Sequence, residues 1–431
     1  MEHLTAHKIS LLDPAVADQI AAGEVVERPA AALKEILENS IDAGAREISV
    51  RILGGGIELI EVIDDGRGIA AEELRLALAR YATSKIQSAH DLTTIATLGF
   101  RGEALAAISA VSRFTLSSRT LGSDLGREIK VEASRTLSEA PIARAEGTSV
   151  RIENLFFNVP ARLKFLKTVP YEASQCALVV YRAALANPKI QFRLDDGTKS
   201  FFRGGVDGAE RVAEVFREGF GVPVKKEELL PISREKPEIR VHGYLLPQKF
   251  NLKSSRGVHA FVNGRAVKDR VITQAIIQAA KEVSFGAEYP QAALFLELSP
   301  ELVDVNVHPT KAEVRFREPS PFGFIYRAVQ EALRPLKLPE ASPLPHLTSP
   351  ENSALPDFKS PAANDAEIFS LPNLELGFQH FERAPESPIV MNAATGVRYL
   401  GSVNDTYLIC QSPAGLLLVD QPLMYERLQV Q

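Results

Sequence analysis

Two short stretches of the chain carry side chains whose types and spacing could do chemistry together. Glu35, Asn39 and Asp42 are spaced so that a helix would gather them on one side. Asp64 is followed by glycines at 66 and 68, which let a backbone approach a ligand closely because they carry no Cβ. A carboxylate can deprotonate water and an amide oxygen can bind a divalent cation, so the two stretches suggest the floor of a nucleotide site. The alternative is that the first three residues form only the solvated face of an amphipathic helix.

A helix and a hairpin must position these side chains. Residues 29–43 are expected to form the helix, because Pro29 suits a first helical turn and Gly44 suits the left-handed residue that closes a helix. Its apolar residues fall on one stripe, opposite the polar residues, and are Leu33, Ile36, Leu37 and Ile41. Apolar and polar residues alternate over 47–53 and 57–63 around three glycines, which is typical of a half-buried hairpin.

Two later segments add candidate phosphate contacts. Residues 98–105 indicate a glycine loop that runs into a helix, where free N–H groups and the positive end of the helix dipole favour phosphate. Residues 83–91 follow a predicted helix at 72–81, lack periodicity and are a candidate lid. The alternatives are a tight turn for the glycines and an ordinary connection between helices for the lid.

The remaining periodicity predicts more of a mostly antiparallel sheet and then a second α+β domain. Strands at 113–118, 129–133 and 148–152 would extend the sheet, and a helix at 171–187 would pack on it. The elements expected in the second domain are helix 209–218, strands 239–246 and 258–262, helix 271–283, strand 293–298 and helix 322–333. Proline-rich residues from 335 to 388 then predict a linker, and short strands are expected at 399–403, 406–410 and 416–420.

Composition and charge exclude several classes of protein. The sequence contains no run of about eighteen apolar residues, so no membrane span is predicted, and the N-terminus shows no secretory signal. The two cysteines, Cys176 and Cys410, and the eight scattered histidines show no disulfide framework or zinc-ligand spacing, which fits a reducing cytoplasm. The net charge is −5, but residues from 338 onward hold 4 basic and 11 acidic residues. The preceding part is therefore free to carry a basic face.

A run of basic residues between 249 and 270 is the candidate for that face. It contains Lys249, Lys253, Arg256, Arg265, Lys268 and Arg270, with no acidic residue before Asp269. Arg162, Lys164 and Lys167 could extend it from the first domain. The alternative is an ordinary solvated surface, which is what most basic clusters are.

Several motifs together resemble the MutL family of DNA mismatch repair proteins, within the ATPase superfamily shared with DNA gyrase, heat-shock chaperones and histidine kinases. They lie at residues 19–29, 34–45, 64–69, 82–85, 99–105, 157–162, 262–265 and 303–311, and cover roughly the first three-quarters of the chain. The ATPase motifs identify only the superfamily, whereas residues 23–29 and the loop around His308 point to the MutL family.

The resemblance implies an α+β chain in four parts. A Bergerat-fold ATPase domain is expected at 1–205 and a transducer and DNA-binding domain, similar to domain 2 of ribosomal protein S five, at 206–337. A disordered linker is expected at 338–395 and the truncated start of a C-terminal dimerisation domain at 396–431.

The resemblance also implies the site residues, with ATP and Mg²⁺ as cofactors. Glu35 would activate the attacking water, Asn39 would bind Mg²⁺, and Asp64 would accept the adenine amino hydrogen, with Thr148 beside it. Lys311 would reach the γ-phosphate from the second domain. The remaining nucleotide contacts would be Gly66, Gly68, Thr83, Ser84, Lys85, Gly99, Phe100, Arg101, Gly102, Glu103, Ala104 and Leu105. The DNA contacts would be Arg162, Lys253, Arg256, Arg265, Lys268 and Arg270.

The expected partners are DNA, bound without regard to sequence, the mismatch-recognition protein MutS, a downstream endonuclease or helicase, and a second copy of the chain in the presence of ATP. The expected setting is the bacterial cytoplasm, at the nucleoid. Nicking of DNA is not expected, because Pro422 and Leu423 replace the histidine and alanine of the nuclease motif found in many relatives, although Asp420, Gln421 and Glu426 are kept. An ATP-dependent topoisomerase subunit and a nucleotide-sensing scaffold without turnover are the alternatives.

Overall fold

The computed structural model falls into two compact units, Met1–His346 and Leu347–Gln431, which are described separately. The residues that it describes are 20, 22–23, 25–85, 98–99, 102–197, 199–282, 288–299, 302–304, 315–316, 320–334, 390–392, 397–403, 407–412 and 415–420.

The helix α2 (Pro29–Asp42) is the element on which the first domain is built. Pro29 occupies its first turn, and Gly44 takes a left-handed φ of 76° just after its end, as predicted. Leu33, Ile36 and Leu37 are buried in the core. The other side of α2 is therefore left to its polar residues.

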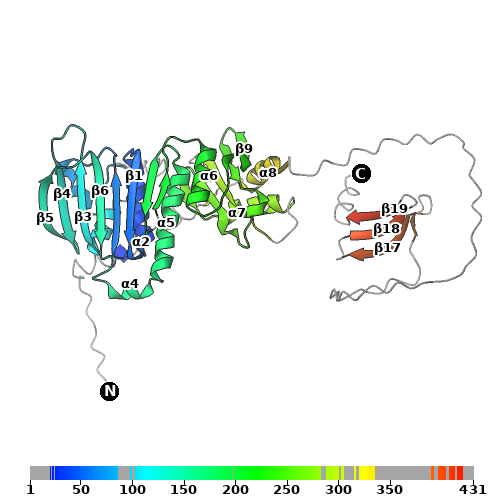
Figure 1. The fold of residues 1–431 in the computed structure, drawn as a ribbon, viewed down its shortest axis with the longest axis horizontal. Helices are drawn as coiled ribbons and strands as arrows, with labels where there is room; N and C mark the ends of the chain where they lie inside the picture. The colour runs from blue at the N-terminus through cyan, green and yellow to red at the C-terminus, as the bar shows by residue number, and fades with distance from the viewer. Residues whose placement is uncertain are drawn as a thin grey trace, which may run out of the picture. The chain divides into compact units, whose positions relative to one another are not determined.

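An eight-stranded sheet covers the apolar face of α2 (Figure 1). Its strands are β1 (Glu47–Leu53), β2 (Leu59–Asp64), β3 (Arg113–Arg119), β4 (Gly126–Glu132), β5 (Arg135–Ile142), β6 (Gly147–Glu153), β7 (Gln191–Asp195) and β8 (Lys199–Phe202). They lie in the order β5-β4-β3-β6-β2-β1-β7-β8, and only β1 and β7 pair in parallel. The mostly antiparallel sheet is confirmed, while β5, β7 and β8 were not predicted.

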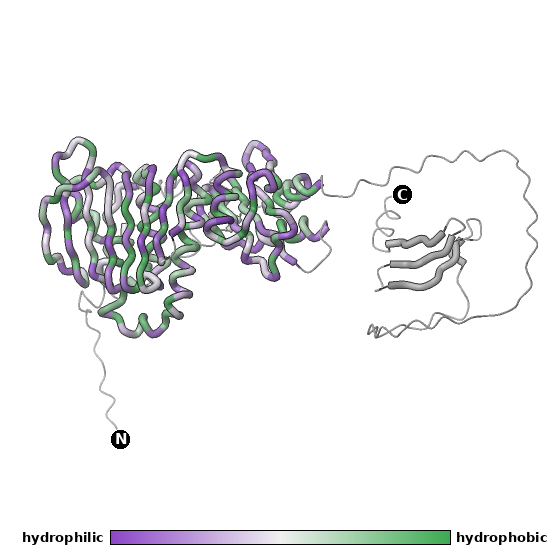
Figure 2. Tube along the Cα trace, viewed as in Figure 1, coloured by the Kyte–Doolittle hydropathy of each residue, from purple (hydrophilic) through white to green (hydrophobic). Residues whose placement is uncertain are grey.

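Hydrophilic and hydrophobic residues alternate along the strands (Figure 2), and buried and more exposed residues alternate along β1 and most of β2. Helices α2, α3 (Ala104–Ala110) and α5 (Val169–Ala186) share the core beneath the buried face. The short helix α4 (Pro160–Phe165) lies in the same domain.

The helix predicted at 72–81 is wrong. The segment forms two short 3-10 turns instead, η2 (Ala71–Glu73) and η3 (Leu76–Leu78). Leu74 is buried, but Leu76 and Tyr81 are exposed, and Tyr81 takes a positive φ of 63°. Local helix propensity is weak evidence, and tertiary packing overrides it here.

The second domain has a five-stranded sheet in the order β12-β11-β13-β10-β9. The strands are β9 (Leu230–Lys236), β10 (Ile239–Leu245), β11 (Val258–Val262), β12 (Arg265–Val267) and β13 (Ala292–Leu298). Its helices are α6 (Gly208–Glu218), α7 (Arg270–Lys281) and α8 (Phe322–Leu333), and the caps of α6 and α7 are Asp207 and Asp269. All six predicted elements are present, whereas β9 and β12 were missed.

The first core continues into the second domain. Val212 and Phe216 of α6, Phe261 of β11 and Ala293 of β13 belong to the same buried cluster as residues of the eight-stranded sheet. A second cluster lies between the five-stranded sheet and helices α7 and α8. The α+β class is therefore confirmed.

The second unit contains a four-stranded antiparallel sheet. Its strands are β16 (Val390–Asn392), β17 (Val397–Val403), β18 (Tyr407–Ser412) and β19 (Gly415–Asp420), the last three matching the strands predicted there. A two-stranded pair, β14 (Val303–Asp304) with β15 (Arg315–Phe316), belongs to the first unit. No helix in the described part of the chain is long and apolar enough to cross a membrane.

Candidate nucleotide site

Asp64, the last residue of β2, is a buried carboxylate surrounded by hydrogen-bond donors. The hydroxyl of Ser40 donates to its Oδ2 at 2.7 Å, and the backbone N–H groups of Gly66 and Thr148 donate to its Oδ1 at 2.9 and 3.3 Å. Burial raises the pKa of Asp64 above its usual range, and the three donors and the charge of Arg144 oppose that rise. The donors fix the carboxylate as an acceptor with a set direction.

Sheet register explains why residues far apart in sequence meet here. In the antiparallel pair of β2 and β6, Asp64 lies opposite Thr148. Thr148 is buried, and its hydroxyl lies 3.0 Å from that of Ser118, which also accepts the N–H of Ile69 at 2.7 Å. The predicted pairing of Thr148 with Asp64 is therefore present in the structure.

The glycines after Asp64 fit closely against neighbouring backbone. A Cβ on Gly66 would lie 2.8 Å from the Cβ of Ala43 at the end of α2. A Cβ on Gly68 would clash with the carbonyl of Arg119. Glycine at these positions therefore allows the loop to pack beside α2 and β3.

The polar face of α2 faces Lys85. The Lys85 ammonium donates to Asn39 Oδ1 at 2.8 Å and to Asp42 Oδ2 at 2.5 Å. Glu35, one turn before Asn39 on α2, is half-buried. Thr83 accepts the backbone N–H of Lys85 at 3.2 Å.

The glycine loop begins beside the same face. The backbone N–H groups of Leu98 and Gly99 donate to Asp42 at 3.0 and 3.1 Å. Gly102 has a φ of 64°, and a Cβ there would lie 2.5 Å from the carbonyl oxygen of Ala82. Only glycine suits both the conformation and the space at this position.

The structure thus brings most of the predicted site together. Glu103 precedes α3, whose first residues are Ala104 and Leu105, as the loop-to-helix pattern predicted. Ser84 is exposed beside Lys85. Phe100, Arg101 and Lys311 lie outside the described residues, as does the candidate lid from residue 86 to 91.

Sequence reasoning missed two donors and left one carboxylate unassigned. Ser40 and Ser118 orient Asp64 and Thr148, but each sits at least 24 residues from the partner it holds, so no local pattern points to the contact. Asp42 was placed on the polar face of α2 without a role. The sequence feature that could have indicated a role for Asp42 is its position three residues after Asn39, on the same face of the helix.

Oxygen donors alone make up the candidate metal site, which suits Mg²⁺. Asn39 offers an amide oxygen, and Asp42 and Glu35 lie on the same helix face. Among the described residues, no group of three or more His, Cys, Asp or Glu could hold a metal ion by itself. A magnesium ion that takes most of its ligands from phosphates and water fits this sparse set.

The predicted DNA contacts divide into exposed and engaged residues. Lys253, Arg256, Lys268 and Arg270 are exposed. Arg265, in β12, is only 8% exposed, which disfavours a phosphate contact, and its role in DNA binding stays a prediction.

Arg162 is likewise an anchor within the first domain. Its guanidinium donates to the carbonyl of Val26 at 2.5 Å and lies over the ring of Phe156. The guanidinium therefore holds the segment that leads into α2, and a DNA contact of Arg162 stays a prediction.

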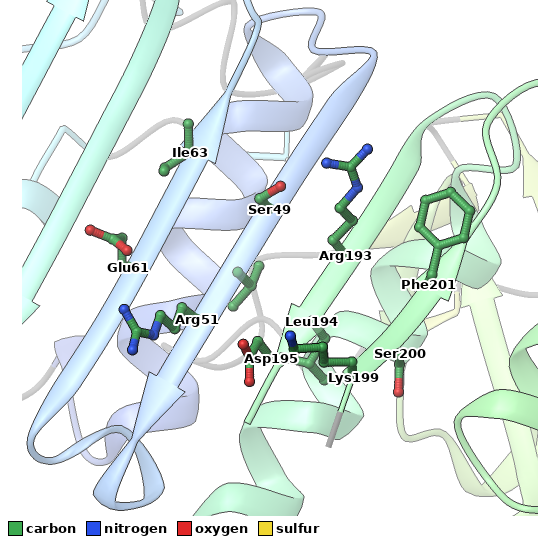
Figure 3. A pocket seen from close by; sticks show the side chains of 11 residues that line it. Ser49, Arg51, Glu61, Ile63, Arg193, Leu194, Asp195, Lys199, Ser200 and Phe201 are labelled. Atoms are coloured by element: carbon green, nitrogen blue, oxygen red, sulfur yellow. The ribbon is translucent and has the colours of Figure 1, made fainter. Parts of the chain in front are cut away.

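The open face of the sheet carries a hollow of about 450 Å³, which Figure 3 views with α2 behind the strands. Its lining side chains come from β1, β2, β7 and β8 and include Arg51, Glu61, Ile63 and Phe201. None of the nucleotide-site residues predicted from the sequence lines it.

Comparisons with known proteins agree with this geometry. Residues 27–156 match the family described as histidine kinase-, DNA gyrase B-, and HSP90-like ATPase, and residues 219–334 match the family described as DNA mismatch repair protein, C-terminal domain.

Among curated proteins, the DNA mismatch repair protein MutL of Acidiphilium cryptum is 41% identical over 97% of this chain and 72% of its own length. MutL of Geobacter sulfurreducens is 38% identical over 98% of this chain and 74% of its own length. MutL of Pseudomonas putida is 45% identical over 76% of this chain and 52% of its own length.

Solved structures point the same way. The Aquifex aeolicus MutL ATPase domain complexed with ADP superposes with a TM-score of 0.50 at 27% identity, over 64% of this chain and 94% of that one. An N-terminal domain of a DNA repair protein, at 24% identity, shares the fold with a TM-score of 0.62 over 74% of this chain and 98% of that one.

Proposed function

The chain belongs to the MutL family of DNA mismatch repair proteins, and we propose that it binds and hydrolyses ATP as a conformational switch, binds DNA, and couples mismatch recognition to downstream repair factors. The observation that carries the proposal is the joining of α2 to the end of β2 through Ser40 and Asp64, with Lys85 held on Asn39 and Asp42. This arrangement supports the proposal, because an oriented carboxylate that could accept from a base lies on the strand joined to the polar helix.

In the proposed reaction, Glu35 orients the attacking water and takes its proton, because phosphoryl transfer needs an in-line nucleophile beside the terminal phosphate. Asn39 would hold Mg²⁺, which would supply positive charge against the phosphates. Lys85 contributes a positive charge at the phosphates, and the N–H groups around Gly99 and Gly102 contribute donors.

Recognition of adenine falls to Asp64. An ionised carboxylate only accepts hydrogen bonds, so it pairs with an exocyclic amino group and disfavours the carbonyl that guanine presents at the same position. The donors from Ser40, Gly66 and Thr148 aim the carboxylate and favour its ionised form.

The test separates hydrolysis from binding. Glu35→Ala should abolish phosphate release while ATP still binds, whereas Asp64→Asn should weaken binding itself. Glu58→Ala, at an exposed position of the β1–β2 hairpin, is the matched control and should behave as wild type. Hydrolysis at the wild-type rate in Glu35→Ala would show that the base is assigned wrongly. Phosphate release by the wild-type chain would exclude a nucleotide-sensing scaffold without turnover.

The switch is proposed to act through pairing of two N-terminal regions when ATP binds. Sedimentation of the chain with a non-hydrolysable ATP analogue should show a dimer that Asp64→Asn does not form. A wild-type chain that stays monomeric at high concentration with the analogue bound would refute this step.

The DNA-binding surface is proposed to be the exposed basic residues Lys253, Arg256, Lys268 and Arg270, which contact phosphate without reading sequence. MutS and a downstream endonuclease or helicase are the proposed partners, and the bacterial cytoplasm, at the nucleoid, is the proposed setting. Lys311 is kept as a proposed contact to the terminal phosphate.

We keep the domain boundaries 1–205, 206–337, 338–395 and 396–431 as proposals. The chain is proposed not to nick DNA, because proline at 422 cannot ligate a metal through its side chain.

A further inference from the structure

The carboxylate of Asp42 gathers donors from two separate stretches of chain. Asp42 is the last residue of α2, and its side chain is 7% exposed. Its Oδ2 accepts the ammonium of Lys85 at 2.5 Å and the N–H of Gly99 at 3.1 Å, and its Oδ1 accepts the N–H of Leu98 at 3.0 Å. One side chain therefore ties Lys85 to the backbone of Leu98 and Gly99.

Close packing around these contacts leaves little freedom. A Cβ on Gly99 would lie 3.0 Å from the Lys85 ammonium and 3.4 Å from Asn39 Oδ1. The ammonium itself bridges Asn39 and Asp42, and its side chain is 14% exposed. Lys85, Gly99 and the polar end of α2 thus form one contact set centred on Asp42.

Electrostatics explain why a carboxylate is needed at this position. The C-terminal end of a helix carries partial negative charge, so an ammonium beside Asp42 is stabilised by both the side chain and the helix. An asparagine there would keep one oxygen but turn an NH₂ group toward donors, so it could not accept all three hydrogen bonds.

We propose that Asp42 is a positioning residue of the nucleotide site, which holds the Lys85 ammonium and the Leu98–Gly99 backbone where the phosphates meet them. The inference rests on the proposed function, because it requires that this site bind a nucleotide. Asp42 acts through Lys85 and Gly99 and has no part in the chemical step itself.

The experiment measures the dissociation constant of a non-hydrolysable ATP analogue with Mg²⁺, by calorimetry on the full chain. Asp42→Asn should weaken binding about tenfold or more, since it removes a charge-assisted pair and disturbs two backbone contacts. Lys85→Met should weaken binding as well. The double variant should bind about as weakly as the weaker single variant, because residues that act through one contact are not additive.

Asp65→Asn is the matched control. The Asp65 carboxylate also accepts two backbone N–H groups, from Arg46 at 2.7 Å and Glu47 at 2.8 Å. Its substitution should change affinity by less than about twofold, as expected of a residue outside the contact set. A loss equal to that of Asp42→Asn would mean that local unfolding explains both.

Asp42→Glu guards against a variant that fails to fold, because it keeps the charge and should bind the analogue better than Asp42→Asn. The inference is overturned if Asp42→Asn binds as wild type, if its effect multiplies with that of Lys85→Met, or if Asp42→Glu folds and shows no recovery. Failure of the wild-type chain to bind the analogue would overturn the proposed function itself. That outcome is distinguishable from failure of the inference, because it is seen in the wild-type chain before any variant is measured.

Discussion

Arg211 of α6 attaches the second domain to the first, and its replacement by methionine should destabilise the chain strongly. The side chain is fully buried. Its guanidinium donates to the carbonyls of Ala184 at 2.8 Å and Ile190 at 2.9 Å, and further donations go to the carbonyls of Asn187, Pro188 and Arg203. These acceptors belong to the end of α5 and to the chain on either side of the β7–β8 pair, so one cation joins three elements.

The expected loss follows from what methionine leaves behind. Methionine fills much of the same space, so the loss of stability comes mainly from polar groups left without partners. Buried carbonyls lose a donor, and Glu214, which is 4% exposed, loses the cation whose Nε lies 3.5 Å away. Removing one partner of a buried ion pair costs about 3–5 kcal/mol. Arg203 still pairs with Glu214 at 3.1 Å, so we expect the lower end, about 3 kcal/mol. Burial lowers the pKa of Arg211 to about 10, which leaves it charged at neutral pH.

Urea unfolding followed by circular dichroism measures the free energy directly. Arg217→Met is the control on the same helix, since that side chain is 44% exposed and pairs with Glu218 at 3.1 Å. It should cost less than about 0.5 kcal/mol. A loss below about 1 kcal/mol for Arg211→Met, or one no larger than the control, would refute the role given to the buried guanidinium.

Three further predictions concern the sites. Affinity for adenosine nucleotides should fall as the pH drops through the pKa of Asp64, because protonation removes the acceptor. Burial raises that pKa, so the loss should occur at a higher pH than for an ordinary aspartate. The Asp64→Asn variant should lack this part of the pH dependence. Arg270→Glu should weaken DNA binding and reduce the slope of log affinity against log salt concentration by about one or more. Arg135→Glu, on the edge strand β5, is the control and should leave both the affinity and the slope unchanged. An affinity that does not depend on salt would contradict phosphate contact. Incubation with supercoiled plasmid and Mn²⁺ should give no nicking. Nicking that survives purification and disappears in Asp420→Asn would show that the altered nuclease motif is still active.

The elements that could be predicted are those with local signals. Pro29, Gly44 and the apolar stripe gave α2 to within one residue, and alternation around three glycines gave the β1–β2 hairpin. The 72–81 segment failed because its helix-favouring residues carry no information on what they pack against. The edge strands β5 and β8 were missed for a related reason, since pairing with a neighbour rather than their own pattern defines them.

Prediction of the site depended on resemblance wherever long-range register was needed. Residues 64 and 148 meet only because β2 and β6 pair in one register, which no window of sequence contains. The family motif supplied that pairing. It did not supply Ser40, whose hydroxyl holds the carboxylate from the buried side of α2.

Charged residues show most clearly what a sequence leaves open. Arg162, Arg211 and Arg265 are equally cationic in the printed chain, yet the first holds a backbone carbonyl at 2.5 Å, the second is fully buried among carbonyls, and the third is buried in β12. A guanidinium that is buried or bound to backbone carbonyls is less available to phosphate than an exposed one, so counting basic residues overestimates a DNA-binding face. Exposure therefore has to be combined with charge before a cation is assigned to DNA, and on that criterion Lys268 and Arg270, adjacent to the start of α7, remain the strongest positions at which to test binding.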